Sequence, residues 1–435
     1  MDGHIKIPIL PRIRDRGPAR HFHGRTDQRA SFVRVLGGAK NDPGRGTTFL
    51  VQGPPGVGKT ALLHKMAQDA AGEWDVVHIK PAALESPVVM AQTLGKTYVA
   101  NREENFKAGA KILETGFAKQ IAGTQTVVGA LRDCLNPRDN VILVLDEAQH
   151  LANPSVRAAE AAIRDALDDI TNGRTERKVV LLLGGLGNTE SALEQMGLSR
   201  LERNCLHNLK GLHGNEARNV IGDWLVDVGC AAEHLASWVS VLADLADGWP
   251  QHLIICAAVA AEKFSEHSSA PTPEVIREIR DKVGKEKETY YRLRQKGLAT
   301  EIIVILGLLV AYAGAGCHYA HSRLLSALGV IHKDDVGAES ALAILIKKGV
   351  VAEHADDALY YIPIPSMERH LLEQASRVAA HDPGLVLSIA RKLLLVLADY
   401  RQGHTPQLPT QLRRVLGDAG MGTPPRQRGP LEAEG

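Results

Sequence analysis

The stretch Gly53-Pro54-Pro55-Gly56-Val57-Gly58-Lys59-Thr60 fits the phosphate-loop pattern G-x-x-x-x-G-K-[ST] at every position. It follows an apolar run typical of a buried strand and precedes a helix predicted over Lys59–Ala71. In such a loop, backbone N–H groups and the positive end of the helix dipole face the phosphates. The lysine bridges the β- and γ-phosphates, and the threonine hydroxyl ligates Mg²⁺. The sequence therefore predicts an α/β P-loop fold that binds ATP and Mg²⁺ through residues 53–60 and Ala61.

A second apolar run, Val141-Ile142-Leu143-Val144-Leu145, ends in Asp146-Glu147, which is the Walker B pattern. An aspartate at the end of such a strand holds Mg²⁺, and the adjacent glutamate can polarise the water that attacks the γ-phosphate. An Asp-Glu pair after a strand is often only the start of a solvated loop. Downstream of a complete phosphate loop, the pair instead predicts ATP hydrolysis, with Asp146 at the metal and Glu147 as the catalytic residue.

Further strands are predicted over Trp74–Ile79 and Lys178–Leu183, with a helix over Pro154–Ile170 between them. This is the element order of a P-loop ATPase with an additional central strand. A polar residue just beyond the last strand would lie between Walker B and the γ-phosphate. Asn188 is the first choice for this position and Thr189 the second, although an asparagine in a glycine-rich loop can also be a simple turn residue.

Three further segments bear on the family: Phe22-His23-Gly24-Arg25, Leu198-Ser199-Arg200-Leu201-Glu202-Arg203 and Gly248-Trp249-Pro250. With the Walker motifs, they make residues 22–261 resemble the AAA+ ATPases that include origin-binding initiators, transposition-helper ATPases and STAND ATPases. The resemblance implies that Gly24 and Arg25 lie beside the adenine and that Asn188 is a sensor-1 residue.

The resemblance also implies an arginine finger that reaches a neighbouring protomer, and therefore self-association. Arg203 is the better candidate and Arg200 the alternative, while both could be surface arginines. After the G-x-P turn, many members carry a sensor-2 arginine where this chain has Gln251 and His252. Neither provides a permanent charge, so slow, switch-like turnover is expected.

The composition restricts the partners and the compartment. The formal net charge of +1 gives no overall field for nucleic acid or an anionic membrane. Five cysteines without a C-x-x-C pair indicate free thiols in a cytoplasmic protein and no Cys or His metal site. The longest apolar stretch, Ile302–Cys317, is too short to span a bilayer, and no membrane partner is expected.

The C-terminal part predicts a winged helix-turn-helix: helices over Ala299–Ala311, Ser322–Leu328 and Val336–Lys348, then a hairpin over Val350–Ile362. The third helix lacks arginine, glutamine and asparagine for base edges, and the hairpin tip carries Asp356 and Asp357. If duplex DNA binds, sequence preference should be weak. A domain that contacts protein is an equal alternative.

Together these features predict a flexible tail (1–20), an AAA+ core (21–211), an all-α lid (212–285), a winged-helix domain (286–375), and a helix with a disordered end (376–435). Two functions remain open. The first is a switch or loader in a DNA-associated process such as replication, transposition or mobile-element defence. The second is a STAND-like signalling ATPase that oligomerises and engages a protein effector.

Overall fold

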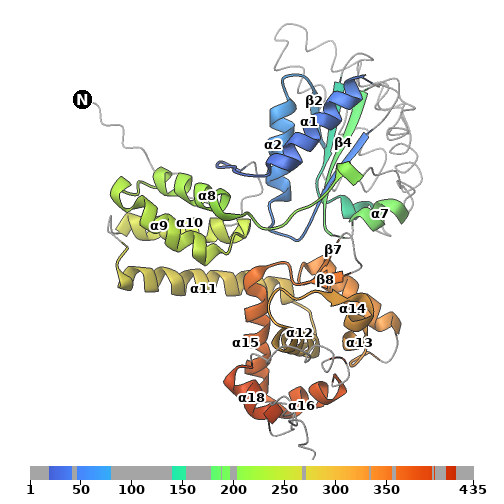
Figure 1. Cartoon of the computed structure of the whole chain (residues 1–435), viewed down its shortest axis with the longest axis vertical. Coiled ribbons are helices and arrows are strands. Elements are labelled where there is room, and N and C mark those ends of the chain that lie inside the picture. Colours follow the sequence, from blue (N-terminus) through green and yellow to red (C-terminus); the bar gives the residue numbers. More distant parts are fainter. Residues whose placement is uncertain are drawn as a thin grey trace, which may run out of the picture. The chain divides into compact units, whose positions relative to one another are not determined.

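The computed structural model describes residues 19–41, 47–79, 140–152, 178–187, 189–195, 203–266, 271–332, 335–354, 359–393, 396 and 408–417. The chain divides into two compact units, residues 1–283 and 284–435 (Figure 1). The predicted helix over Pro154–Ile170 lies outside the described residues.

The first unit contains a five-stranded parallel sheet in the order β2-β3-β4-β1-β5. The strands are β1 (Thr47–Gln52), β2 (Asp75–Ile79), β3 (Asn140–Leu145), β4 (Lys178–Gly185) and β5 (Leu206–Asn208). Strand β4 lies between β1 and β3, which confirms the predicted additional central strand. The phosphate loop follows β1 and Walker B follows β3, so both lie at the carboxyl edge of the sheet, where parallel α/β folds place their ligands.

Two helices, α1 (Thr26–Asn41) and α2 (Lys59–Ala70), pack against this sheet (Figure 1). Helix α2 buries Leu62, Leu63 and Met66, whose three- and four-residue spacing puts them on one face. Strands β1, β3 and β4 are buried over most of their length, as expected for central parallel strands covered on both faces. The short helix α7 (Thr189–Gln195) contacts the 3₁₀ helix η2 (Ala148–Ala152), which follows Walker B.

A three-helix group follows the sheet within the same unit. It consists of α8 (Gly214–Asp227), α9 (Ala232–Ala246) and α10 (Pro250–Glu266), which pack around the fully buried Trp238 and Leu242. Helix α10 begins at the proline of the Gly248-Trp249-Pro250 turn, as its position at N1 favours. The long helix α11 (Pro273–Gln295) then continues across the boundary between the units.

The second unit contains the predicted three helices and hairpin: α12 (Thr300–Ala313), α13 (His321–Leu328), α14 (Asp335–Lys348), β7 (Ala352–His354) and β8 (Leu359–Tyr361). A short strand that the sequence did not reveal, β6 (Tyr319–Ala320), pairs with β8 and completes an antiparallel sheet in the order β6-β8-β7. The hairpin tip with Asp356 and Asp357 lies outside the described residues.

Helix α12 is buried almost throughout and packs against α15 (Pro365–His381). The contact is close at Gly307, where an added Cβ would lie 2.6 Å from the Ala375 Cβ. Within the described residues no single helix has the length and apolarity to cross a bilayer, although the bent pair α11 and α12, at 119°, meets both criteria together.

One expectation for the C-terminal half needs correction. The predicted disordered end contains a helix, α18 (Thr410–Gly417), which buries Leu412 and Leu416 and contacts α15 and α16 (Pro383–Lys392). Lys287 of α11 is only 7% exposed and donates to Ser366 Oγ of α15 at 3.5 Å. Tyr291 of the same helix also donates to Ser366 Oγ, at 2.6 Å, so this part of α11 has a face buried against α15.

Candidate functional site

The phosphate loop connects the buried end of β1 to the N-terminus of α2 through backbone conformations that favour glycine. Gly56 and Gly58 have φ values of +87° and +95°, and Gly58 is the N-cap residue of α2. Gly53 donates its N–H to the Gly185 carbonyl of β4 at 3.1 Å. The loop is therefore held against the central strand while its backbone turns into the helix. The positive end of the helix dipole consequently lies at the loop, as phosphate binding requires.

Lys59 is 6% exposed and lies over this loop. Its Nζ donates to the carbonyl oxygens of Gly53 at 2.9 Å and Pro54 at 3.1 Å. These two contacts hold the ammonium group at the loop, where its charge faces the place of the phosphates.

Thr60 and Asp146 meet although 86 residues separate them in sequence. The Thr60 hydroxyl donates to Asp146 Oδ2 at 2.6 Å, and both side chains are half-buried. A hydroxyl and a carboxylate at this distance form the hard oxygen donor set that Mg²⁺ prefers. The residues therefore fit the predicted metal, with Thr60 as a ligand and Asp146 beside it.

Glu147 has a φ of +57°, an unusual conformation for a residue with a side chain. Its N–H donates to Asp146 Oδ1 at 3.0 Å, which helps to hold the turn after β3. Its carboxylate accepts a hydrogen bond from Gln149 Nε2 at 2.5 Å. The Gln149 Oε1 in turn accepts from the Leu186 N–H, just beyond β4, at 3.1 Å.

The end of β4 lies directly beside Walker B. A Cβ on Gly184 would come within 3.0 Å of Asp146 Oδ1, so glycine permits this close approach. Asn188 follows in the same loop but lies outside the described residues. Thr189, the alternative sensor-1 candidate, is fully buried and donates its hydroxyl to the Leu186 carbonyl at 2.7 Å. In this structure Thr189 thus stabilises the loop.

Arg25, predicted together with Gly24 beside the adenine, contacts the phosphate loop. Arg25 Nη2 donates to the Val57 carbonyl at 3.1 Å and to the Lys210 carbonyl at 2.6 Å. Burial lowers the pKa of the Arg25 guanidinium, while the charge of Glu216 opposes that shift. Both Gly24 and Arg25 have positive φ, at +78° and +60°, so the chain turns sharply here before α1 begins.

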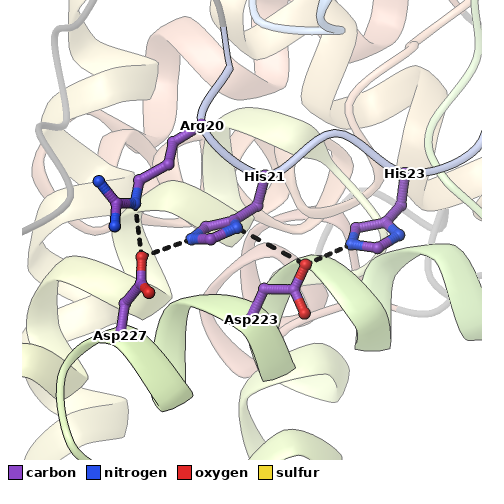
Figure 2. Close-up of polar contacts among 5 residues, drawn as sticks. All are labelled: Arg20, His21, His23, Asp223 and Asp227. Atoms are coloured by element: carbon purple, nitrogen blue, oxygen red, sulfur yellow. Dashed lines mark hydrogen bonds and ion pairs between the residues drawn. The ribbon is translucent and has the colours of Figure 1, made fainter.

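The residues just before this turn contact two aspartates of helix α8 (Figure 2). Arg20 and His21 both contact Asp227 Oδ2, at 2.5 and 2.7 Å. His23 contacts Asp223 Oδ2 at 2.6 Å. Burial opposes ionisation of Asp227, but the hydrogen bonds from Arg20 and His21 outweigh it and lower the pKa of that carboxyl. Residues 20–25 thereby connect the helical group to the phosphate loop.

The turn that starts α10 forms a second connection to the phosphate loop. Gln251 donates its N–H to the Gly56 carbonyl at 3.1 Å, and Gly248 accepts from the Leu212 N–H at 2.7 Å. Gly248 has a φ of +67°, and a Cβ there would lie 2.2 Å from the Leu212 carbonyl oxygen. His252, the other residue at the expected sensor-2 position, is fully buried. The Gln251 backbone thus contacts the loop at the position where the family resemblance implied an arginine.

The predicted arginine finger is only partly described. The backbone of Arg203 begins the 3₁₀ helix η4 (Arg203–Cys205), immediately before β5. Arg200 lies outside the described residues. Of the five cysteines in the sequence, the four in the described part, Cys205, Cys230, Cys256 and Cys317, are free thiols.

Comparison with protein families supports a nucleotide-binding P-loop site in the first unit. Residues 21–181 match the family model of the AAA ATPase domain. This part of the chain is therefore similar to AAA ATPase domains. No curated protein matches the sequence.

The comparison with solved structures matches this chain over most of its length. One match is a Walker-type ATPase of Pyrococcus abyssi, with 15% identity and a TM-score of 0.54 over 83% of this chain and 99% of that chain. Another is the ORC2 protein of Aeropyrum pernix in its ADPNP–ADP complexes, with 12% identity and a TM-score of 0.49 over 88% of this chain and 98% of that chain. At 15% identity, the likeness to the Walker-type ATPase shows the fold.

Sequence reasoning did not identify Gln149, Asp223 or Asp227 as parts of this site. Gln149 is two residues beyond the Walker B glutamate, and that proximity was the available signal. The two aspartates are about one helical turn apart on α8, and their partners lie some 200 residues earlier. No local pattern indicates such pairing.

Proposed function

We propose that the protein binds Mg²⁺ and ATP at the phosphate loop and hydrolyses the γ-phosphate. The contact between Thr60 and Asp146 carries this proposal, because it joins Walker A to Walker B across the central strand at 2.6 Å. An incidental glycine-rich turn would not bring a hydroxyl and a carboxylate together beside a buried lysine. The AAA ATPase domain match over residues 21–181 supports the same activity.

Each residue has a distinct role in this proposal. Backbone N–H groups of residues 56–61 and the ammonium of Lys59 hold the phosphates. Thr60 and Asp146 hold Mg²⁺, which when bound supplies charge neutralisation at the phosphates. Glu147 orients the attacking water and accepts its proton. Asn188 would contact the γ-phosphate from the loop after β4.

We further propose that nucleotide state acts as a switch on the helical group. Arg25 and Gln251 both contact carbonyls of the phosphate loop, at Val57 and Gly56. Nucleotide binding at the loop would therefore act on residues 20–25 and on the start of α10. Since Gln251 stands where an arginine is common in AAA+ proteins, no permanent cation from α10 stabilises the transition state. Slow turnover is expected.

The process served by this switch is proposed to be DNA-associated. The order of α12, β6, α13, α14, β7 and β8 is that of a winged helix, a domain type that binds duplex DNA through its third helix. Asp335 and Glu339 on the exposed side of α14 only accept hydrogen bonds, so neither can make the bidentate contacts by which Arg, Asn or Gln reads a purine edge. Contacts to the phosphate backbone would then dominate, with weak sequence preference and strong salt dependence.

The exposed side of α14 favours a second candidate, a STAND-like ATPase whose winged helix contacts a protein effector. Val336 is 74% exposed and Ile344 46% exposed on this helix. Apolar side chains suit a protein partner better than a phosphate backbone. In that case ATP-driven self-association would present this helix to the effector.

Two substitutions test the ATPase proposal. Lys59→Ala should abolish tight ATP binding because it removes the charge that faces the phosphates. Glu147→Gln should keep ATP affinity and lower turnover at least about 100-fold, because binding and water activation are separate tasks. Normal turnover by Glu147→Gln would overturn the assignment.

Light scattering after size exclusion separates the two candidate processes. The protein would be run with ADP and with a non-hydrolysable ATP analogue, each with and without a duplex of random sequence. Co-elution with the duplex at low salt supports the DNA-associated process. Assembly with the analogue in the absence of any duplex binding supports the effector candidate.

A further inference from the structure

Gln149 connects two parts of the candidate active site through one side-chain amide. Its Nε2 donates to Glu147 Oε2 at 2.5 Å, while its Oε1 accepts from the Leu186 N–H at 3.1 Å. An amide donates at one atom and accepts at the other, so it can serve a carboxylate and a backbone N–H together. Gln149 therefore connects the glutamate that follows β3 to the loop that follows β4.

Both ends of this connection are attached to ordered backbone. The Leu186 carbonyl accepts from the Thr189 N–H at 2.9 Å and from its hydroxyl at 2.7 Å, which holds the loop after β4. The Glu147 backbone is held by its N–H bond to Asp146 Oδ1 at 3.0 Å. The half-buried Glu147 side chain still has rotatable bonds of its own, and the hydrogen bond from Gln149 restrains them.

We infer that Gln149 is a positioning residue for hydrolysis, which fixes the Glu147 carboxylate through Oε2 and leaves Oε1 to accept from the attacking water. This inference rests on the proposed ATPase function. The same amide gives the loop after β4 a direct mechanical connection to the carboxylate. A shift of that loop beside the γ-phosphate would change the orientation of Glu147, so sensing and water activation are linked through one side chain.

Two substitutions at the same position separate the donor from the acceptor. Gln149→Met removes both hydrogen bonds at similar volume. Gln149→Glu keeps an oxygen for the Leu186 N–H but replaces the donor with a second carboxylate oxygen beside Glu147. Since small displacements of a catalytic group lower rates strongly, both variants should lower kcat by about 10-fold to about 100-fold, with the KM for ATP within about twofold of wild type.

His150→Ala is the matched control, because this exposed residue of the same 3₁₀ helix contacts Glu147 only through its backbone N–H. Its kcat should equal that of wild type. If Gln149 merely braced the loop after β4, Gln149→Glu would retain wild-type kcat, and that result would overturn the inference.

A double substitution tests whether Gln149 acts through Glu147. In a Glu147→Ala background, Gln149→Met should leave the residual hydrolysis unchanged, because the carboxylate it positions is absent. A further loss as large as in wild type would show an independent structural role. Absence of hydrolysis by the wild type would overturn the proposed function itself, whereas a hydrolysing wild type that tolerates both Gln149 variants would overturn the inference alone.

Discussion

Gly248→Ala should destabilise the first unit by about 2–3 kcal/mol. The left-handed conformation of Gly248, with φ of +67°, costs a residue with a side chain about 1–2 kcal/mol. The new Cβ would also lie 2.2 Å from the Leu212 carbonyl oxygen, so the backbone must separate there. The hydrogen bond from the Leu212 N–H would be lost with it, worth about 1 kcal/mol.

Tryptophan fluorescence during urea unfolding provides the assay, because all four tryptophans, Trp74, Trp224, Trp238 and Trp249, belong to the first unit. Gly229→Ala is the control. Gly229 has a φ of +83° but nothing lies within 4 Å of an added Cβ, so only the conformational cost of about 1–2 kcal/mol applies, without the loss of a hydrogen bond. Equal destabilisation by the two substitutions would refute the argument that the contact with residue 212 matters.

Gly307→Val should lower the stability of the second unit by about 2–4 kcal/mol, because its Cβ would lie 2.6 Å from the Ala375 Cβ. The control Gly284→Ala, where nothing lies near an added Cβ in α11, should be neutral or slightly stabilising. Unfolding of both variants would be followed by far-ultraviolet circular dichroism. Burial lowers the pKa of His370 to about 4 from 6.5, so the unfolded chain binds more protons between these values and stability should rise with pH across that window. His370→Asn should flatten the rise, of about 1–3 kcal/mol, in urea titrations at pH 4.5 and 7. Arg203→Ala should lower ATP turnover only at protein concentrations where the wild type is assembled. If turnover per subunit in a dilution series is the same for the variant and the wild type, Arg203 is a surface residue without a catalytic role.

Much of the ATPase fold was predictable because its signals are local. The apolar runs of β1, β3 and β4 and the glycines of the phosphate loop each report on their own backbone. Once β4 is recognised as the strand between the Walker motifs, the meeting of Thr60 and Asp146 follows from the geometry of a parallel sheet.

The remaining features depend on contacts between residues that are far apart in the sequence, so no short stretch of sequence predicts them. His21 and His23 find their hydrogen-bond partners, Asp227 and Asp223, only once α8 has folded beside them (Figure 2). Helix α18 escaped prediction because its eight residues lie in a segment rich in Pro, Gly and Arg, where average composition favours disorder. Its apolar side chains become buried only against the helices that precede it.

The position of β1 in the sheet has a consequence for synthesis on the ribosome. This strand pairs with β4, where Thr47 lies opposite Val180, and with β5, where Leu50 lies opposite Leu206. Chains emerge from the N-terminus at about 5–20 residues per second, so β1 and the phosphate loop wait several seconds or more without either neighbouring strand. During that interval the apolar residues Phe49, Leu50 and Val51, all fully buried in the finished fold, have no sheet to enter. The nascent first third of this protein is therefore the stretch for which protection by a chaperone matters most.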